Sequence, residues 1–253
     1  MVKPKKHLGQ HFLLDLSIAE DIAKSLRLES EIVLEIGPGT GVLTQFLKEL
    51  YPEKLKLIEI DRESIAYLKQ KFPALINSIH DKDFLQLDLN ELGTSRISII
   101  GNYPYNISSQ IVFKAIENRE KVVELSGMFQ KEVAERICAG PGSKTYGIMS
   151  VLSQAYFKAE YLFSVPPNVF NPPPKVDSGV IRLSRFRSII PDCDEAFFIR
   201  VVKQAFNQRR KTLRNALKPL LPEGFKSDVL QLRAERLSAE NFIELSREII
   251  DKS

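Results

Sequence analysis

Short apolar segments alternate with helical patterns over residues 32–113, and this alternation constrains the fold more than any other feature. Three segments have the composition of strands, namely Ile32–Ile36, Lys54–Ile60 and Ile97–Ile100, and Ser78–Leu87 holds a weaker strand followed by a turn. Apolar residues at helical spacing occupy Val42–Leu50 and Arg62–Phe72, the two stretches that separate the first, second and third predicted strands along the chain. Repeated strand–helix–strand units predict an α/β fold with a mostly parallel sheet and helices on both faces. Ligands of such sheets bind at the carboxyl ends of the strands.

The second half of the chain changes character near residue 188. We expect a fifth strand at Glu124–Met128, and residues 161–186 predict a strand, a proline-rich loop and another strand. Beyond Pro191 only helical patterns remain, over Asp194–Asn207, Thr212–Leu217, Lys226–Leu230 and Ala239–Ile250. The sequence therefore predicts a catalytic domain over residues 1–188 and a small all-helical C-terminal domain over residues 189–253.

Composition narrows the class of protein. Cys138 and Cys193 are too few and too far apart for a disulfide framework, and the three histidines show no metal-ligand spacing, so we expect no metal. No apolar run reaches membrane-spanning length and the first residues lack a signal-peptide pattern, so we expect a cytoplasmic protein without membrane contact. The net charge of +4 is compatible with a polyanionic partner but does not require one.

A glycine-rich segment, Glu35–Gly41, follows the first predicted strand. Gly37 and Gly39 let the backbone turn sharply and approach a ligand closely. The spacing is G-x-G-x-G, which differs from the G-x-G-x-x-G pattern that binds a dinucleotide pyrophosphate. A simple strand-to-helix turn is the alternative interpretation of this segment taken alone.

Carboxylates follow the next two predicted strands. The second strand ends in Glu59-Ile60-Asp61, where a carboxylate can accept both hydroxyls of a ribose. The third ends near Asp83 and Phe84, where an acid can accept from an adenine amino group and an aromatic ring can cover the base. Together with the glycine loop, these residues favour S-adenosylmethionine over NAD as the cofactor.

The fourth predicted strand leads into Asn102-Tyr103-Pro104-Tyr105. Pro104 lacks an N–H and pushes Tyr103 into an extended conformation, so the Tyr103 carbonyl and the Asn102 side-chain oxygen can point the same way. Two adjacent acceptors beside the Tyr105 ring suit a planar base with an exocyclic amino group. An ordinary proline turn with packed tyrosines is the alternative. The position of this turn, fourth in a series of ligand-binding strand ends, favours the catalytic interpretation.

These segments resemble those of the ribosomal RNA adenine dimethyltransferases, and the resemblance extends from the N-terminus into the helical tail. The matching stretches are His7–Leu13, Glu35–Gly41, Glu59–Asp61, Asn102–Asn106, Gln130–Val133, Ala139–Lys144 and Val165–Ser178. The resemblance implies a Rossmann-like class I methyltransferase sheet. It also implies an S-adenosylmethionine site lined by His11, Leu13, Gly37, Glu59, Asp83 and Asn102. Two residues depart from the family pattern, since His11 replaces the common Asn and Tyr103 replaces Leu or Ile.

The same resemblance suggests what the chain acts on. It implies N6,N6-dimethylation of two adjacent adenines near the 3′ end of 16S rRNA, carried out by a monomer on a pre-assembled small ribosomal subunit. Asn102 and the Tyr103 carbonyl would accept the amino hydrogens, and Tyr105 would stack on the extruded base. Phe170, in the proline-rich loop, is our candidate for the opposite face of that base.

A basic cluster in the C-terminal part predicts contacts with the RNA backbone. Its members are Arg209, Arg210, Lys211 and Arg214. If the segment is helical, Arg210, Arg214 and Lys218 share one face while Leu213 and Leu217 pack inward. With Lys3, Lys5 and Lys6, this cluster could form a phosphate-binding surface. The alternative is an ordinary solvated helix face.

Three other functions fit parts of the sequence. A large-subunit rRNA adenine methyltransferase of the antibiotic-resistance type shares the catalytic motifs, but the Val165–Ser178 segment argues against it. A non-catalytic RNA-binding assembly factor could share the fold, although the intact set of Glu59, Asp83 and Asn102 favours catalysis. DNA amino-methylation is the weakest alternative, because we find no target-recognition domain.

Overall fold

The computed structural model describes residues 2–94 and 96–252, which form two compact units. The first unit comprises Met1–Ala134 and Lys158–Arg185, and the second comprises Glu135–Phe157 and Phe186–Ser253. The second unit thus includes residues 135–157, which the sequence-based division assigns to the catalytic domain. The chain leaves the first unit for the last time after Arg185. A domain boundary at residue 188 remains a prediction.

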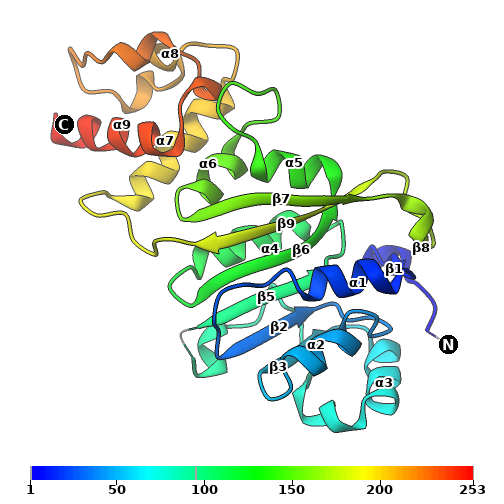
Figure 1. Cartoon of the computed structure of the whole chain (residues 1–253). Coiled ribbons are helices and arrows are strands. Elements are labelled where there is room, and N and C mark those ends of the chain that lie inside the picture. Colours follow the sequence, from blue (N-terminus) through cyan, green and yellow to red (C-terminus); the bar gives the residue numbers. More distant parts are fainter. Residues whose placement is uncertain (1, 95, 253) are drawn as a thin grey trace. The chain divides into compact units, whose positions relative to one another are not determined.

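A seven-stranded sheet forms the centre of the first unit, with helices on both of its faces (Figure 1). In sheet order the strands are β4 (Ile79–Asp81), β3 (Leu55–Glu59), β2 (Ile32–Ile36), β5 (Ile97–Asn102), β6 (Val122–Gln130), β9 (Ser178–Arg185) and β7 (Phe157–Val165). Strands β4 to β6 pair in parallel, whereas β9 pairs antiparallel to β6. The α/β architecture predicted from the strand–helix alternation is confirmed.

From the central strands β2 and β5, the chain continues toward opposite edges of the sheet. The helices of this unit are α1 (Leu16–Ala23), α2 (Thr44–Leu50), α3 (Arg62–Lys71), α4 (Ser108–Glu117) and the start of α5 (Lys131–Cys138). Helix α2 connects β2 to β3 on one side, and α4 connects β5 to β6 on the other. Since such crossovers are right-handed, α2 and α4 cover opposite faces of the sheet. A crevice therefore forms where the adjacent strands β2 and β5 end, and ligands of α/β sheets bind there.

The central strands are buried on both faces. All five residues of β2 and the first five of β5 are buried. This is the reason apolar residues predominate in both strands without regular alternation, with Glu35 and Ser98 as the polar exceptions. The prediction for β3 extends one residue too far at each end, because the observed strand is Leu55–Glu59. The described part of the chain has no helix that is both long and apolar enough to cross a membrane.

A second, two-stranded sheet brings the N-terminal segment to the proline-rich loop. Strand β1 (Phe12–Leu13) pairs antiparallel with β8 (Phe170–Asn171), and Leu13 lies opposite Phe170. The backbone N–H of Leu14 also donates to the Val169 carbonyl at 2.8 Å. Short 3₁₀ helices flank these strands and other loops, at Lys6–Leu8, Pro73–Ser78, Leu89–Leu92 and Pro167–Val169.

The second unit is helical and has its own apolar core. Its helices are α6 (Ile148–Gln154), α7 (Glu195–Asn207), α8 (Leu213–Ala216) and α9 (Ala239–Asp251), with 3₁₀ turns at Lys218–Leu220, Asp228–Gln231 and Ala234–Arg236. Phe198 of α7 and Phe242 of α9 are fully buried in it. The segment predicted as a helix at Lys226–Leu230 is a 3₁₀ turn beginning at Asp228 instead.

Candidate active site

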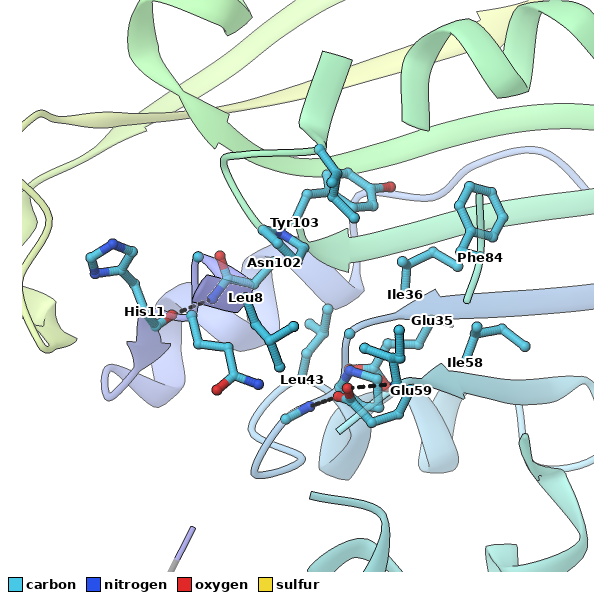
Figure 2. A pocket seen from close by; sticks show the side chains of 18 of the residues that line it. Leu8, His11, Glu35, Ile36, Leu43, Ile58, Glu59, Phe84, Asn102 and Tyr103 are labelled. Carbon is cyan, nitrogen blue, oxygen red and sulfur yellow. Dashed lines mark hydrogen bonds between the residues drawn. The ribbon is translucent and has the colours of Figure 1, made fainter. Parts of the chain in front are cut away.

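A cavity opens in the first unit where β2, β3, β4 and β5 end, and Figure 2 shows the side chains around it. The sequence-predicted residues that line it are His11, Leu13, Gly37, Gly39, Glu59, Asp83, Phe84, Asn102, Tyr103, Pro104 and Tyr105. Each of the four strands thus delivers one of the predicted motifs to the same cavity. This convergence follows from the parallel pairing, because parallel strands place their carboxyl ends at one edge of a sheet.

The glycine loop requires its glycines for two reasons. Gly37 and Gly39 have φ angles of +65° and +56°, a region that other residues rarely adopt. A Cβ at Gly39 would also lie 2.9 Å from the Phe12 ring, so the loop passes directly beneath the N-terminal segment. The loop is therefore a close-packed wall of the cavity.

Glu35 lies beneath this loop and is fully buried. The pKa of Glu35 is raised to about 8, chiefly by burial and also by the neighbouring Glu59, while the hydrogen bond from the Thr44 hydroxyl opposes the shift. That hydroxyl donates to Glu35 Oε2 at 2.7 Å. Glu35 is therefore mainly protonated at neutral pH. Our sequence interpretation gave it no role, because its burial follows from the tertiary structure.

Glu59 ends β3 and faces the cavity with a nearly buried carboxylate. Burial raises its pKa, while three backbone N–H groups that donate to it oppose the shift. Gly39 donates to Oε2 at 3.0 Å, and Ile60 and Asp61 each donate to Oε1 at 2.9 Å. These bonds fix the carboxylate and tie the end of β3 to the glycine loop.

Ile60 extends the same wall with an apolar surface. Its side chain is 51% exposed although it lines the cavity. An exposed apolar side chain beside Glu59, the acid predicted to bind ribose, suits the face of an adenine ring. The sequence carried a signal for this residue, an apolar side chain between two acids just past a strand, which our prediction did not use.

The N-terminal segment is fastened over the end of β3. Lys5 forms an ion pair with Asp61 at 2.5 Å, and Gln10 donates to the same carboxylate at 3.4 Å. Burial by itself would raise the pKa of Asp61, but these bonds and those from Ser64 and the Glu63 N–H lower it. Lys5 is therefore occupied by an intramolecular ion pair, which weakens its predicted part in a phosphate-binding surface.

Asp83 begins the turn that follows β4. Its carboxylate accepts the Leu85 backbone N–H at 2.9 Å and the Gln86 side-chain amide at 3.1 Å. Phe84 is buried, at 3% exposed, and lines the cavity. The predicted pair of an acid and an aromatic ring therefore lies together at the cavity that Glu59 and Ile60 also line.

Asn102 is oriented by the N-terminal segment. Its side-chain Nδ2 donates to the His11 backbone carbonyl at 3.0 Å, drawn as a dashed line in Figure 2. Because the nitrogen is engaged in this bond, the side-chain oxygen is left to accept hydrogens from a ligand. His11 thus orients Asn102 through its backbone carbonyl. This contact does not depend on whether the side chain at position 11 is His or Asn.

The Tyr103 side chain points away from the cavity and into the core. The phenol donates to the Ser126 carbonyl at 2.6 Å, and the ring packs 4.8 Å from that of Phe129. Burial raises the pKa of this phenol well above its usual value. A Cβ at Gly127 would lie 2.6 Å from the ring, so glycine makes room for it. Because the ring lies in the core, Tyr103 lines the cavity with its main chain.

Tyr105 is held at the mouth of the cavity by residues distant in sequence. Its hydroxyl shares a hydrogen bond with the Ser178 hydroxyl at 2.5 Å, and its ring stacks on that of His11 with centroids 5.4 Å apart. The His11 Nδ1 lies 2.7 Å from the Pro172 carbonyl oxygen. Burial raises the pKa of Tyr105, and the bond with Ser178 opposes the shift. Our prediction did not assign Ser178 this contact.

Phe170 does not join these rings. It is 3% exposed in the hydrophobic core of the first unit, and it is absent from the described residues that line the cavity. Its pairing with Leu13 in the two-stranded sheet explains this burial. In this conformation the Phe170 ring is not placed to stack on a base beside Tyr105.

The basic cluster lies in the second unit and is not a continuous helical face. Arg209–Lys211 form a turn after α7, and α8 covers only Leu213–Ala216, so the predicted i, i+4 row is wrong. Leu213 and Leu217 are fully buried, as predicted. Arg209 donates to the Lys144 carbonyl at 2.6 Å and lies 3.9 Å from Glu235. Arg210, Lys211 and Arg214 are exposed.

The cavity suits S-adenosylmethionine in its donor set. The acids Glu35, Glu59 and Asp83, an exposed apolar side chain and a close-packed glycine loop line one continuous space. A ribose, an adenine and an amino-acid chain require such groups. Within residues 2–94 and 96–252, no group of three or more His, Cys, Asp or Glu side chains could hold a metal ion.

Comparisons with known proteins show the family of the chain. The family model for ribosomal RNA adenine dimethylases matches residues 1–251. A ribosomal RNA small subunit methyltransferase A from Bacteroides thetaiotaomicron is 54% identical over 98% of this chain and 95% of its own length. The protein of that name from Flavobacterium johnsoniae is also 54% identical, over 98% of this chain and 96% of its own length.

Two solved structures share the fold. A dimethyladenosine transferase from Plasmodium falciparum is 26% identical, with a TM-score of 0.81 over 96% of this chain and 98% of that one. The 23S rRNA methyltransferase ErmE is 24% identical, with a TM-score of 0.72 over 93% of this chain and 99% of that one. At that identity the second likeness supports the fold alone.

Proposed function

The chain belongs to the ribosomal RNA adenine dimethylase family, and we propose that it transfers methyl groups from S-adenosylmethionine to the N6 atoms of two adjacent adenines near the 3′ end of 16S rRNA. The observation that carries the chemistry is the bond from Asn102 Nδ2 to the His11 carbonyl. It leaves a fixed side-chain oxygen at the cavity, next to the Tyr103 main chain. Two such acceptors suit the amino group of an adenine.

The cofactor would be held by the walls of the cavity. Glu59 would accept the ribose hydroxyls, and its burial makes each such bond stronger than in water. Asp83 would accept from the adenine amino group, with Ile60 and Phe84 on the ring faces. Gly37 and Gly39 would allow the amino-acid part to approach the backbone. Bound there, S-adenosylmethionine supplies an activated methyl group on a sulfonium.

The chain's own residues would activate the acceptor nitrogen. The lone pair of an adenine amino group is delocalised into the ring, so the nitrogen is a poor nucleophile. Hydrogen bonds from its two N–H groups to Asn102 Oδ1 and the Tyr103 carbonyl favour a pyramidal nitrogen with an available lone pair. The same fixed dipoles stabilise positive charge that develops on nitrogen during transfer. No strong base is required, because the ammonium product is acidic.

The target base would leave its stack to reach these acceptors, and Tyr105 would support it there. Base–aromatic stacking contributes about 1–3 kcal/mol per base. One face of the Tyr105 ring is turned to His11, so the base would meet the other face or displace the imidazole. Phe170 could take part only after leaving the core.

The substrate assignment rests on the relatives at 54% identity, which are named for the small subunit. We propose that the chain acts as a monomer in the cytoplasm on a pre-assembled small subunit. The exposed Arg210, Lys211 and Arg214 would contact the RNA backbone.

A methyl-transfer assay with labelled cofactor tests this function. Immature small subunits, large subunits and free DNA would be compared, and the modified base would be mapped. We expect label in small-subunit RNA on two neighbouring adenines, with Asn102→Ala as the inactive control. Labelling of large subunits would instead support the resistance-type activity. Binding to small subunits without any transfer would support a non-catalytic assembly role.

A further inference from the structure

Lys114 is a partly buried lysine that the methyl transfer described above does not use. It lies on α4, and its Nζ donates to the Leu85 carbonyl at 2.8 Å and to the Leu87 carbonyl at 2.6 Å. The ammonium also lies over the Phe84 ring, 5.4 Å from its centroid. All three partners belong to the turn that follows β4.

This turn carries Asp83 and Phe84, the two residues proposed to bind adenine. The Leu85 residue is held on both sides, since Asp83 accepts its N–H and Lys114 donates to its carbonyl. Rotation of this backbone would change the direction of the Asp83 carboxylate and withdraw the Phe84 ring. The shape of the adenine-binding turn therefore depends on a side chain from a different element.

The environment of Lys114 fits a structural cation rather than a solvated one. Burial lowers its pKa, and the carboxylates of Asp83, Glu117 and Asp88 oppose that shift. Hydrogen bonds from a charged donor to backbone carbonyls are stronger than neutral ones. The contact with the Phe84 ring adds a cation–π interaction within the usual distance.

We propose that Lys114 is a positioning residue for the adenosine end of the cofactor. It holds the turn after β4 in the form that presents Asp83 and Phe84 to the cavity. The inference rests on the proposed function, because that function assigns this turn to adenine. Helix α4 begins shortly after Asn102–Tyr105, so one helix would support both the amino-group site and the adenine site.

The test compares ligand affinity with turnover in Lys114→Met, which keeps an unbranched side chain of similar length but removes its charge and donors. We expect the Kd values of S-adenosylhomocysteine and of adenosine, measured by calorimetry, to rise by the same factor, on the order of tenfold. The factors should match because the lost support acts on the part that both ligands share. At saturating cofactor, kcat should stay within about twofold of wild type. Lys114→Arg should restore most of the affinity, because it can also donate to two carbonyls.

Lys121→Met is the matched control, because Lys121 donates to the Thr94 carbonyl at 3.4 Å, and neither residue lines the cavity. Its Kd values should equal those of wild type. Unchanged affinity in Lys114→Met, or a fall in kcat alone, would overturn the inference. If that variant does not fold, Lys114→Gln, which replaces the charged donor by a neutral amide, must show a rise in both Kd values above wild type for the inference to stand. Wild-type protein that binds neither ligand would refute the proposed function and the inference with it.

Discussion

The side-chain nitrogen of Asn102 donates to the backbone carbonyl of His11 at 3.0 Å, and the two residues lie 91 positions apart in the chain. This bond decides which end of the Asn102 amide faces the cavity. It also explains how His11 can serve the site although the family commonly has Asn there, since a backbone carbonyl is available from any residue.

Replacement of Asn102 by Ala should reduce kcat for methyl transfer by at least about a hundredfold, because one of the two fixed acceptors is lost. Cofactor affinity should fall only slightly, since Glu59 and Asp83 remain. Single-turnover kinetics and calorimetry with S-adenosylhomocysteine separate the two effects. Asn90→Ala, an exposed asparagine outside the cavity, is the control. Near-normal turnover of Asn102→Ala would contradict the mechanism.

Replacement of Tyr105 by Ala should lower kcat/KM for the RNA substrate by roughly 10- to 100-fold, the scale of one lost base stack. The Kd for cofactor should change by no more than about threefold. Tyr105→Phe keeps the ring but loses the bond to Ser178, so it should retain most of the activity. Equal losses in the two variants would show that the hydroxyl matters more than the ring.

Glu35 should make the unfolding free energy depend on pH. Its pKa is raised from 4.5 to about 8 in the folded state, so the folded form holds a proton that the unfolded form releases between these values. This contribution to stability is complete below about pH 4.5 and is lost as pH rises toward 8, at up to about 1.4 kcal/mol per pH unit. Urea unfolding of ligand-free protein at several pH values measures it. Glu35→Gln should flatten the dependence, and an unchanged slope would show that Glu35 is ionised in the folded protein.

The double variant Arg210→Ala, Lys211→Ala should reduce the slope of log affinity for RNA against log salt by about 1 to 2, because each phosphate contact contributes about 0.7 to 0.9. Arg209→Ala is the matched comparison. It should change that slope less and lower the stability of the helical unit instead, because Arg209 is engaged with Glu235 and the Lys144 carbonyl. Salt titrations of RNA binding distinguish these outcomes. An equal change in slope would show that Arg209 also reaches the RNA.

Tyr103 shows where prediction from sequence ended. The motif indicated that its carbonyl serves the reaction, but the purpose of a tyrosine where Leu or Ile is usual was not readable. The structure gives the reason, because the phenol bonds to the Ser126 carbonyl on the neighbouring strand and Gly127 leaves space for the ring. The partner strand is far enough along the chain that no local pattern links the two.

Phe170 and Arg209 are similar cases. Both residues are of types that suit RNA contacts. Phe170 has an aromatic ring in a proline-rich loop, and Arg209 is a cation in a basic cluster. Phe170 is buried by its strand pairing with Leu13, and Arg209 is engaged with Glu235. Composition indicated what these side chains could do, whereas their neighbours in space determine what they are available to do.

By itself, the sequence determined the alternation of strands and helices and the order of the motifs at the strand ends. These are local properties, since a buried parallel strand is a continuous apolar run and the functional residue follows directly after it. Parallel pairing then brings the ends together, so the cavity-lining residues could be predicted. The tertiary structure alone decided the hydrogen bonds from Asn102 to His11, between Tyr105 and Ser178, and from Lys114 to the turn after β4. Each of these is a contact between a side chain and a residue that is distant in the sequence. Folding brings the two together, and the spacing of residues along the sequence does not encode the direction in which the side chain points.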